Sequence, residues 1–198
     1  MDPNIMPAAE GGAGLGPRRL QAVLLDQDGT IIVDARYLAD QDGVRLLPGA
    51  LEGLRRLQEL VLALVILSNP SGIGRGMFTR SQHQLVHDRL EALLRAGGVT
   101  LAGSFYCPHA PEDRCDCRKP AVGLAREAAA TLGIDLTRTV VVGDKQADVN
   151  LGRALGVPTV LVAGPMTEPR TSSNRADCVA PNRGEPHGFI GVRADGGA

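Results

Sequence analysis

Short apolar runs alternate with longer amphipathic stretches along most of this chain of 198 residues. The apolar runs suit buried strands, and the stretches between them have the apolar spacing of helices. Strands that alternate with helices form a parallel sheet with helices on both faces. We therefore predict an α/β fold with a Rossmann-like parallel sheet. The expected strands are residues 21–25, 61–67, 104–106, 139–142 and 158–162, and the expected helices are residues 48–60, 81–95, 122–132 and 147–155.

The two ends of the chain differ in composition from its middle. Residues 1–19 are rich in Gly, Ala and Pro, and residues 166–198 are polar without a regular apolar period. Segments of this kind bury too little apolar surface to fold by themselves. We predict a disordered N-terminal tail (1–19), one folded domain (20–165) and a divergent or disordered C-terminal tail (166–198).

The charge balance and the cysteines limit what the protein binds. The formal net charge is -1, from 21 basic and 22 acidic side chains, so no strong field attracts nucleic acid or an anionic membrane. The sequence shows neither a signal peptide nor a membrane-spanning run, which predicts a cytoplasmic protein. Its cysteines should then stay reduced, so metal binding is favoured over disulfides. We expect a monomer without a nucleic-acid or membrane partner.

Two carboxylates follow the first expected strand. Asp26 and Asp28 stand one residue apart at the edge where an open α/β sheet binds its ligands. A calcium loop of the EF-hand type is excluded, because it needs glycine and glutamate where this chain has Ile31 and Tyr37. A polar turn without function is the alternative for this motif taken alone.

Further polar residues follow later strands or begin later helices. In chain order they are Ser68 with Asn69, Arg118 with Lys119, and Asp144 with Lys145 and Asp148. A carboxylate that attacks a phosphate meets a repulsion on the order of several kcal/mol, so the site needs cations. The Asp26 side chain, the Asp28 carbonyl and Asp144 would suit Mg²⁺. Lys119 would add positive charge, and the Ser68 hydroxyl would donate a hydrogen bond to the phosphate. Asp148 is predicted either to support the metal or to lie exposed on a helix.

A cluster of cysteines precedes the lysine. Three thiolates and one imidazole fall within eleven positions, at Cys107, His109, Cys115 and Cys117. This set predicts a closed tetrahedral zinc site of the structural type, and unliganded loop cysteines are the alternative. Cys178 stands alone in the polar tail and is not expected to bind the metal. Because Arg118 and Lys119 follow the cluster at once, zinc would brace the residues that meet the phosphate.

Together these motifs resemble the D-glycero-D-manno-heptose 1,7-bisphosphate 7-phosphatases of the haloacid dehalogenase superfamily. The resemblance rests on Asp26–Thr30, Ser68–Gly76, the cysteine cluster with Arg118–Pro120, and Gly143–Lys145. It implies a haloacid dehalogenase type of fold with a minimal cap and a zinc-binding loop. It also implies a phosphorylated sugar substrate, whose 7-phosphate is removed with Mg²⁺ through an aspartyl-phosphate, in nucleotide-activated heptose biosynthesis.

The resemblance further implies roles for single residues. Asp26 would be the nucleophile, Asp28 the proton carrier, and Arg118 the residue that recognises the second phosphate. Ser68 and Lys119 would complete the catalytic set. Further substrate contacts are implied for Asp34, Ala35, Arg36, Tyr37, Ser68, Asn69, Pro70, Ser71, Lys119 and Lys145.

Two residues depart from the family pattern, and related activities stay open. The family has threonine and glutamine where this chain has Ser68 and Pro70. Pro70 removes a side-chain amide and a backbone N–H, so we expect a changed phosphate loop or substrate preference. Histidinol-phosphate phosphatases share the catalytic residues and the zinc loop, so that activity, or hydrolysis of another small phosphomonoester, is the alternative. DNA 3'-phosphatases resemble Asn69–Gly76 but lack the zinc loop.

Overall fold

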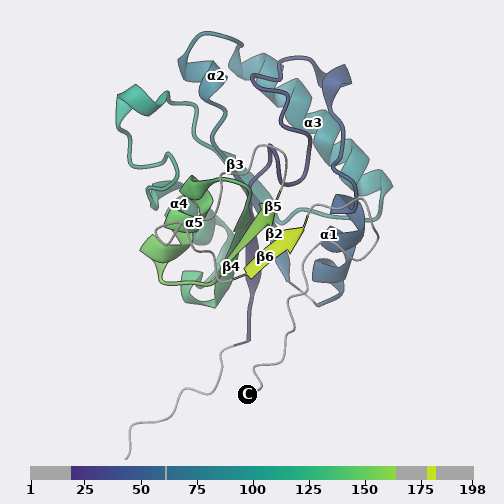
Figure 1. Ribbon diagram of the computed structural model, residues 1–198, viewed down its shortest axis with the longest axis vertical. Coiled ribbons are helices and arrows are strands. Elements are labelled where there is room, and N and C mark those ends of the chain that lie inside the picture. Colours follow the sequence, from purple (N-terminus) through teal and green to yellow (C-terminus); the bar gives the residue numbers. More distant parts are fainter. Residues whose placement is uncertain (1–18, 61, 164–177, 182–198) are drawn as a thin grey trace, which may run out of the picture.

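The centre of the molecule is a parallel sheet with helices on both faces, as the computed structural model in Figure 1 shows. The structure describes residues 19–60, 62–163 and 178–181. The strand order is β3-β2-β1-β4-β5-β6, and all neighbouring strands pair in parallel. The strands are β1 (Ala22–Leu25), β2 (Ala63–Ser68), β3 (Gly103–Tyr106), β4 (Thr139–Gly143), β5 (Thr159–Ala163) and β6 (Cys178–Pro181).

The helices begin and end at residues with identifiable local causes. They are α1 (Ala50–Glu59), α2 (Ser71–Gly74), α3 (Arg80–Ala96), α4 (Gly123–Leu132) and α5 (Gln146–Leu155). The side chain of Thr79 accepts the backbone N–H of Gln82, and the Gln82 side chain accepts the N–H of Thr79, which fixes the start of α3. Helices α4 and α5 end at left-handed glycines, Gly133 and Gly156. No helix among the described residues is long and apolar enough to cross a membrane.

Successive residues of the strands enter two different cores. Val23 and Leu25 pack in a cluster that includes residues of α1 and α3, whereas Leu24 packs with residues of α4 and α5. Figure 1 shows these two pairs of helices on opposite faces of the sheet. Because both faces are covered, the strands are continuous apolar runs, as the sequence predicts. The predicted fold class is confirmed, and the five predicted strands and four predicted helices are all present within a few residues of their expected limits.

Strand β6 lies within residues 166–198, for which the sequence predicts a divergent or disordered tail. It pairs with β5 from Val160 opposite Cys178 to Ala163 opposite Pro181. Four residues are too few for a recognisable apolar period, and a proline suits a strand at the edge of a sheet. Residues 1–18, 164–177 and 182–198, which include most of the two predicted tails, lie outside the described residues.

Candidate active site

Polar residues from distant parts of the chain meet where three central strands end. The register places Leu25 of β1 beside Ile66 of β2 and Val142 of β4. Asp26 follows β1, Ser68 ends β2, and Asp144 follows β4. Parallel strands bring their carboxyl ends to one edge of the sheet, so these side chains gather there. All three are buried.

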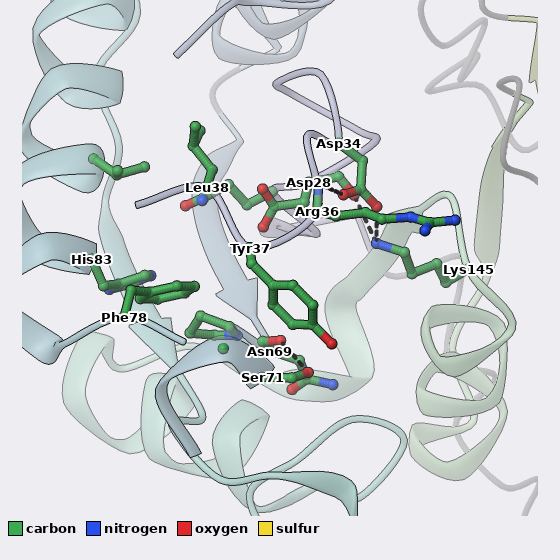
Figure 2. A pocket seen from close by; sticks show the side chains of 14 residues that line it. Asp28, Asp34, Arg36, Tyr37, Leu38, Asn69, Ser71, Phe78, His83 and Lys145 are labelled. Carbon is green, nitrogen blue, oxygen red and sulfur yellow. Dashed lines mark hydrogen bonds and ion pairs between the residues drawn. The ribbon is translucent and has the colours of Figure 1, made fainter. Parts of the chain in front are cut away.

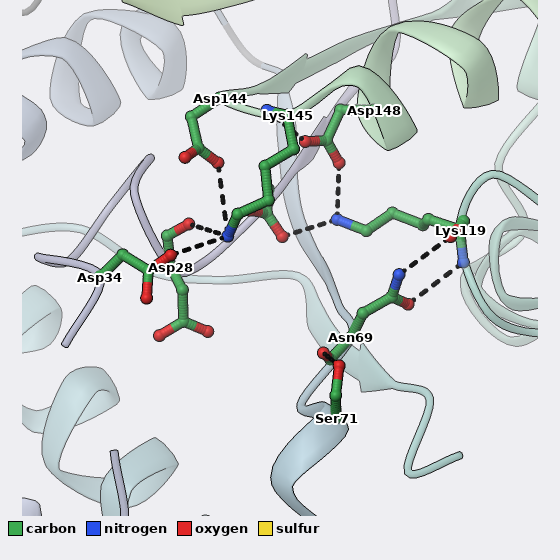
Figure 3. Close-up of polar contacts among 9 residues, drawn as sticks. Asp28, Asp34, Asn69, Ser71, Lys119, Asp144, Lys145 and Asp148 are labelled. Atoms are coloured by element: carbon green, nitrogen blue, oxygen red, sulfur yellow. Dashed lines mark hydrogen bonds and ion pairs between the residues drawn. The ribbon is translucent and has the colours of Figure 1, made fainter. Parts of the chain in front are cut away.

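The Lys119 ammonium joins two carboxylates of this site (Figure 3). Its Nζ lies 2.6 Å from Asp26 Oδ1 and 2.7 Å from Asp148 Oδ1, and the residue is 5% exposed. Asn69 fixes the lysine backbone: its side-chain amide donates to the Lys119 carbonyl at 3.1 Å, and its oxygen accepts the Lys119 N–H at 3.1 Å. The lysine is therefore held at both ends, with its charge directed at Asp26.

Three carboxylates beside this lysine fit a divalent cation. Asp26, Asp144 and Asp148 each offer an oxygen, and these oxygens lie within 4.8 Å of one another. Asp144 Oδ1 is buried and has no hydrogen-bond partner among the described residues. Gly29 lets the backbone approach this group, since a Cβ there would collide with the Asp144 carboxylate. The Lys145 ammonium lies 3.8 Å from Asp144 Oδ1. Hard carboxylate oxygens gathered in this way are the donors that Mg²⁺ takes in proteins.

Burial and crowding of charge shift the pKa values of the site. Burial, and next the charge of Asp26, raise the pKa of Asp28 to about 7. The same two causes raise the pKa of Asp144 to about 8. Burial by itself would lower the pKa of Lys119, but Asp148 and Asp26 outweigh it, so this pKa is raised. Lys119 is therefore charged at neutral pH, and Asp28 can both give and take a proton.

A cavity of about 360 Å³ opens beside these residues (Figure 2). On one side the Lys145 ammonium donates to the Asp28 carbonyl at 3.1 Å and lies 3.0 Å from Asp34 Oδ2. Burial opposes ionisation of Asp34, but the bond from Lys145 prevails and lowers its pKa. The predicted substrate contacts that line the cavity are Asp34, Arg36, Tyr37, Asn69, Pro70, Ser71 and Lys145, together with the proposed proton carrier Asp28.

Other predicted site residues lie outside the lining of this cavity. Ala35 is not part of the lining, and Ser68 lines a second cavity of about 220 Å³. The Ser68 Oγ is buried without a hydrogen-bond partner among the described residues, so it is free to donate to a ligand. Arg118 donates to Ser71 Oγ at 2.9 Å and to the His109 carbonyl at 3.2 Å. It therefore ties the cysteine loop to the loop after β2.

The four predicted zinc ligands form a compact cluster. The Sγ atoms of Cys107, Cys115 and Cys117 lie 3.2 to 3.5 Å apart, and His109 Nδ1 lies 3.3 Å from Cys117 Sγ. A tetrahedral zinc site with Zn–S bonds of about 2.3 Å has sulfur–sulfur edges of about 3.8 Å. Disulfide sulfurs are only about 2.05 Å apart, so these cysteines are not oxidised to disulfides. The donor atoms thus fit Zn²⁺.

Known proteins with related sequences agree with this geometry. Residues 116–185 match the HAD-hydrolase-like family. Over 170 residues the chain is 36% identical to the D-glycero-beta-D-manno-heptose-1,7-bisphosphate 7-phosphatase of Escherichia coli (strain K12), covering 82% of this chain and 89% of that protein. A probable enzyme of this name from Thermoplasma volcanium is 36% identical over 140 residues, covering 70% of this chain and 96% of that protein. The chain belongs to the heptose 1,7-bisphosphate 7-phosphatase family.

The family assignment extends to the tertiary structure. A solved D,D-heptose 1,7-bisphosphate phosphatase from B. bronchiseptica, complexed with magnesium and phosphate, matches with a TM-score of 0.67 and 32% identity. The match covers 72% of this chain and 80% of that one. As a heptose bisphosphate phosphatase homologue, the protein is a phosphoric monoester hydrolase of the haloacid dehalogenase superfamily. The family expected from the sequence is confirmed.

Six residues that line the cavity are not among the predicted site residues, namely Gln27, Leu38, Gly72, Phe78, His83 and Val86. Phe78 and His83 line the cavity from the side of α3. The available signal was weak: His83 continues the buried stripe of α3 that includes Val86 and Leu90. For Asp148 the sequence predicts two alternatives, namely support of the metal or an exposed position on a helix. The structure shows it 2% exposed and paired with Lys119.

We expect His83→Phe to make the protein less sensitive to acid. Both nitrogens of His83 are buried without a partner among the described residues, and burial, then His87, lower its pKa from 6.5 to about 4. Between these pH values the unfolded chain binds a proton that the folded protein refuses, so stability falls as the pH decreases through this range. The variant lacks this contribution. Urea unfolding of both proteins at several pH values from 7 to 4 would measure this contribution to the free energy of unfolding. The same pH dependence in the variant and the wild type would contradict the lowered pKa of His83.

Proposed function

We propose that this protein removes the 7-phosphate of D-glycero-D-manno-heptose 1,7-bisphosphate through an aspartyl-phosphate on Asp26. The observation that carries the proposal is the buried Lys119 ammonium, 2.6 Å from Asp26 Oδ1 at the end of β1. A carboxylate held beside a fixed cation is suited to attack a phosphate, because the cation offsets the repulsion between the two anions. The names of relatives at 36% identity support this choice of substrate.

The first step transfers the phosphoryl group to the protein. An Asp26 oxygen forms a bond to phosphorus while the bond from phosphorus to the sugar oxygen breaks. Asp28 gives its proton to that leaving oxygen, and its pKa of about 7 keeps it partly protonated at neutral pH. Lys119 and the free Ser68 hydroxyl stabilise the charge on the phosphoryl oxygens.

The second step releases inorganic phosphate. Asp28, now deprotonated, takes a proton from water as the water oxygen attacks the phosphorus of the aspartyl-phosphate. The bond from phosphorus to Asp26 breaks, which regenerates the carboxylate beside Lys119. The same residue therefore serves as acid in one step and as base in the other.

We propose Mg²⁺ and Zn²⁺ as the cofactors. The Asp26 side chain, the Asp28 carbonyl and Asp144 would hold the magnesium, which supplies positive charge to the phosphoryl oxygens when bound. The presence of magnesium and phosphate in the related B. bronchiseptica structure supports this assignment. Zinc in the cluster of Cys107, His109, Cys115 and Cys117 would be structural, because all four positions of its tetrahedron are filled by the protein.

The setting of the reaction is also a proposal. The family resemblance supports a place in nucleotide-activated heptose biosynthesis. We propose that the protein acts there as a cytoplasmic monomer. Its net charge of -1 provides no attraction to membranes or nucleic acid, so we propose neither as a partner. Phosphate release from heptose 1,7-bisphosphate, histidinol phosphate and fructose 1,6-bisphosphate in magnesium would test the choice of substrate. Faster turnover of histidinol phosphate would reject the heptose assignment.

We expect Arg118→Ala to weaken selection of the bisphosphate. If Arg118 binds the second phosphate, removing a charge-assisted contact lowers kcat/KM for heptose 1,7-bisphosphate by about ten- to a thousandfold. The loss should be much smaller for a small monophosphate, which cannot reach Arg118. Arg126→Ala removes an exposed arginine from α4 and serves as the control for charge. Equal losses on both substrates would indicate damage to the Ser71 loop or the cysteine loop instead.

A further inference from the structure

The substrate cavity has two chemically different sides (Figure 2). The charged side consists of Asp28, Asp34, Arg36 and Lys145. Phe78, His83 and Val86 also line the cavity, from α3 and the residues just before it, and we call them the α3 wall. In Figure 2, Phe78 and His83 lie beside α3, and Lys145 lies at the other side of the cavity. A ligand in this cavity therefore contacts charged side chains on one side. On the other side it contacts two aromatic rings and one aliphatic side chain.

The α3 wall is held in place by packing. The ring of Phe78 lies directly against Gly72, where any Cβ would collide with it. Phe78 stacks on His83, with ring centroids 6.5 Å apart and an interplanar angle of 9°. His83 in turn contacts Tyr106 of β3, with centroids 4.4 Å apart. A surface ordered before the ligand arrives loses little entropy on binding.

The α3 wall also offers no charge. Phe78 is 7% exposed, Val86 is 2% exposed, and His83 is neutral at neutral pH because burial lowers its pKa to about 4. Neither ring nitrogen of His83 has a hydrogen-bond partner among the described residues, and both are shielded from solvent. The imidazole therefore contributes to the wall as an aromatic ring, and phosphate groups have no reason to bind there.

We infer that the α3 wall binds the carbon face of a phosphorylated sugar while the opposite side takes its hydroxyl groups. This inference rests on the proposed function, which it deepens by naming the surface that selects the sugar. The C–H groups of a sugar lose contact with water on this wall and meet the Phe78 side chain. Phe78 is accordingly a specificity-determining residue, which favours phosphates that carry a sugar.

The test compares a sugar bisphosphate with acetyl phosphate, whose leaving group has no sugar face. For Phe78→Ala, the ratio of kcat/KM for heptose 1,7-bisphosphate to that for acetyl phosphate should fall about tenfold, mainly through a higher KM for the sugar. Phe78→Leu keeps most of the volume without the ring and should lower the ratio by less. Thermal denaturation shows whether each variant is folded. If Phe78→Ala is unfolded, the comparison is made with Phe78→Leu.

Met77→Ala is the matched control. Met77 precedes Phe78, is 58% exposed and is not part of the cavity lining, so its replacement should leave the ratio unchanged. A wild-type ratio in both Phe78 variants, or equal losses on both substrates, would overturn the inference. If the wild-type protein hydrolyses another sugar phosphate instead of the heptose, the proposed function fails. A fall in the kcat/KM ratio of that sugar phosphate to acetyl phosphate in the Phe78 variants would still support sugar binding by the α3 wall. Turnover of sugar-free phosphates alone would reject both.

Discussion

Asp26→Asn is expected to abolish phosphate release from heptose 1,7-bisphosphate, with a loss in kcat on the order of 10⁴-fold or more. An amide has neither the charge nor the nucleophilicity to open the phosphate ester. The fold should survive, because Asn has nearly the same shape and Lys119 keeps its contact with Asp148 at 2.7 Å. The effect is therefore expected on chemistry and not on stability.

Two measurements would make the Asp26 assignment specific. Mass spectrometry of rapidly quenched reactions should show a phosphorylated protein for the wild type and none for Asp26→Asn. Asp148→Asn is the informative control, since it removes the other partner of Lys119 but leaves the attacking carboxylate, so a partial loss is expected. Turnover by Asp26→Asn close to the wild-type rate would show that Asp26 is not the nucleophile.

Loss of the zinc ligands should give the largest fall in stability. We expect about one equivalent of zinc per chain, lost in Cys115→Ser or Cys117→Ser, and a melting temperature lower by on the order of 10 °C. The mean sulfur spacing of the cluster is about 0.4 Å shorter than that of a zinc tetrahedron, so little rearrangement accompanies binding. Without the metal, the buried Cys107 and its neighbours lose the bonds that order the loop.

Elemental analysis and thermal denaturation of the same samples would test the zinc site. Cys178→Ser is the matched control, because Cys178 is remote in sequence from the cluster and is not predicted to bind the metal. Activity should fall together with stability, since Arg118 and Lys119 follow Cys117 directly and Arg118 donates to the His109 carbonyl. Zinc-free wild-type protein with unchanged stability and activity would refute the site.

The sequence by itself determined the fold class and the family, and it predicted most residues of the candidate site. Strand-length apolar runs and helical periods depend on local spacing, so the βα alternation is visible without a structure. The same holds for Asp26 with Asp28 and for the four predicted zinc ligands, because each set lies within a short segment. Since parallel strands end at one edge of the sheet, motifs at several strand ends also predict one common site.

Only the tertiary structure decided which partners these residues meet. Asp148 lies 29 positions after Lys119. It belongs to the first turn of α5, which follows β4, and this position brings its carboxylate to the lysine. Strand β6 is too short for a periodic signal and is defined by its pairing with β5. The α3 wall likewise depends on packing: a buried stripe on a helix predicts that one face is covered, but not whether a sheet, a loop or a ligand covers it. Such contacts join segments far apart in the chain, and local spacing carries no information about them.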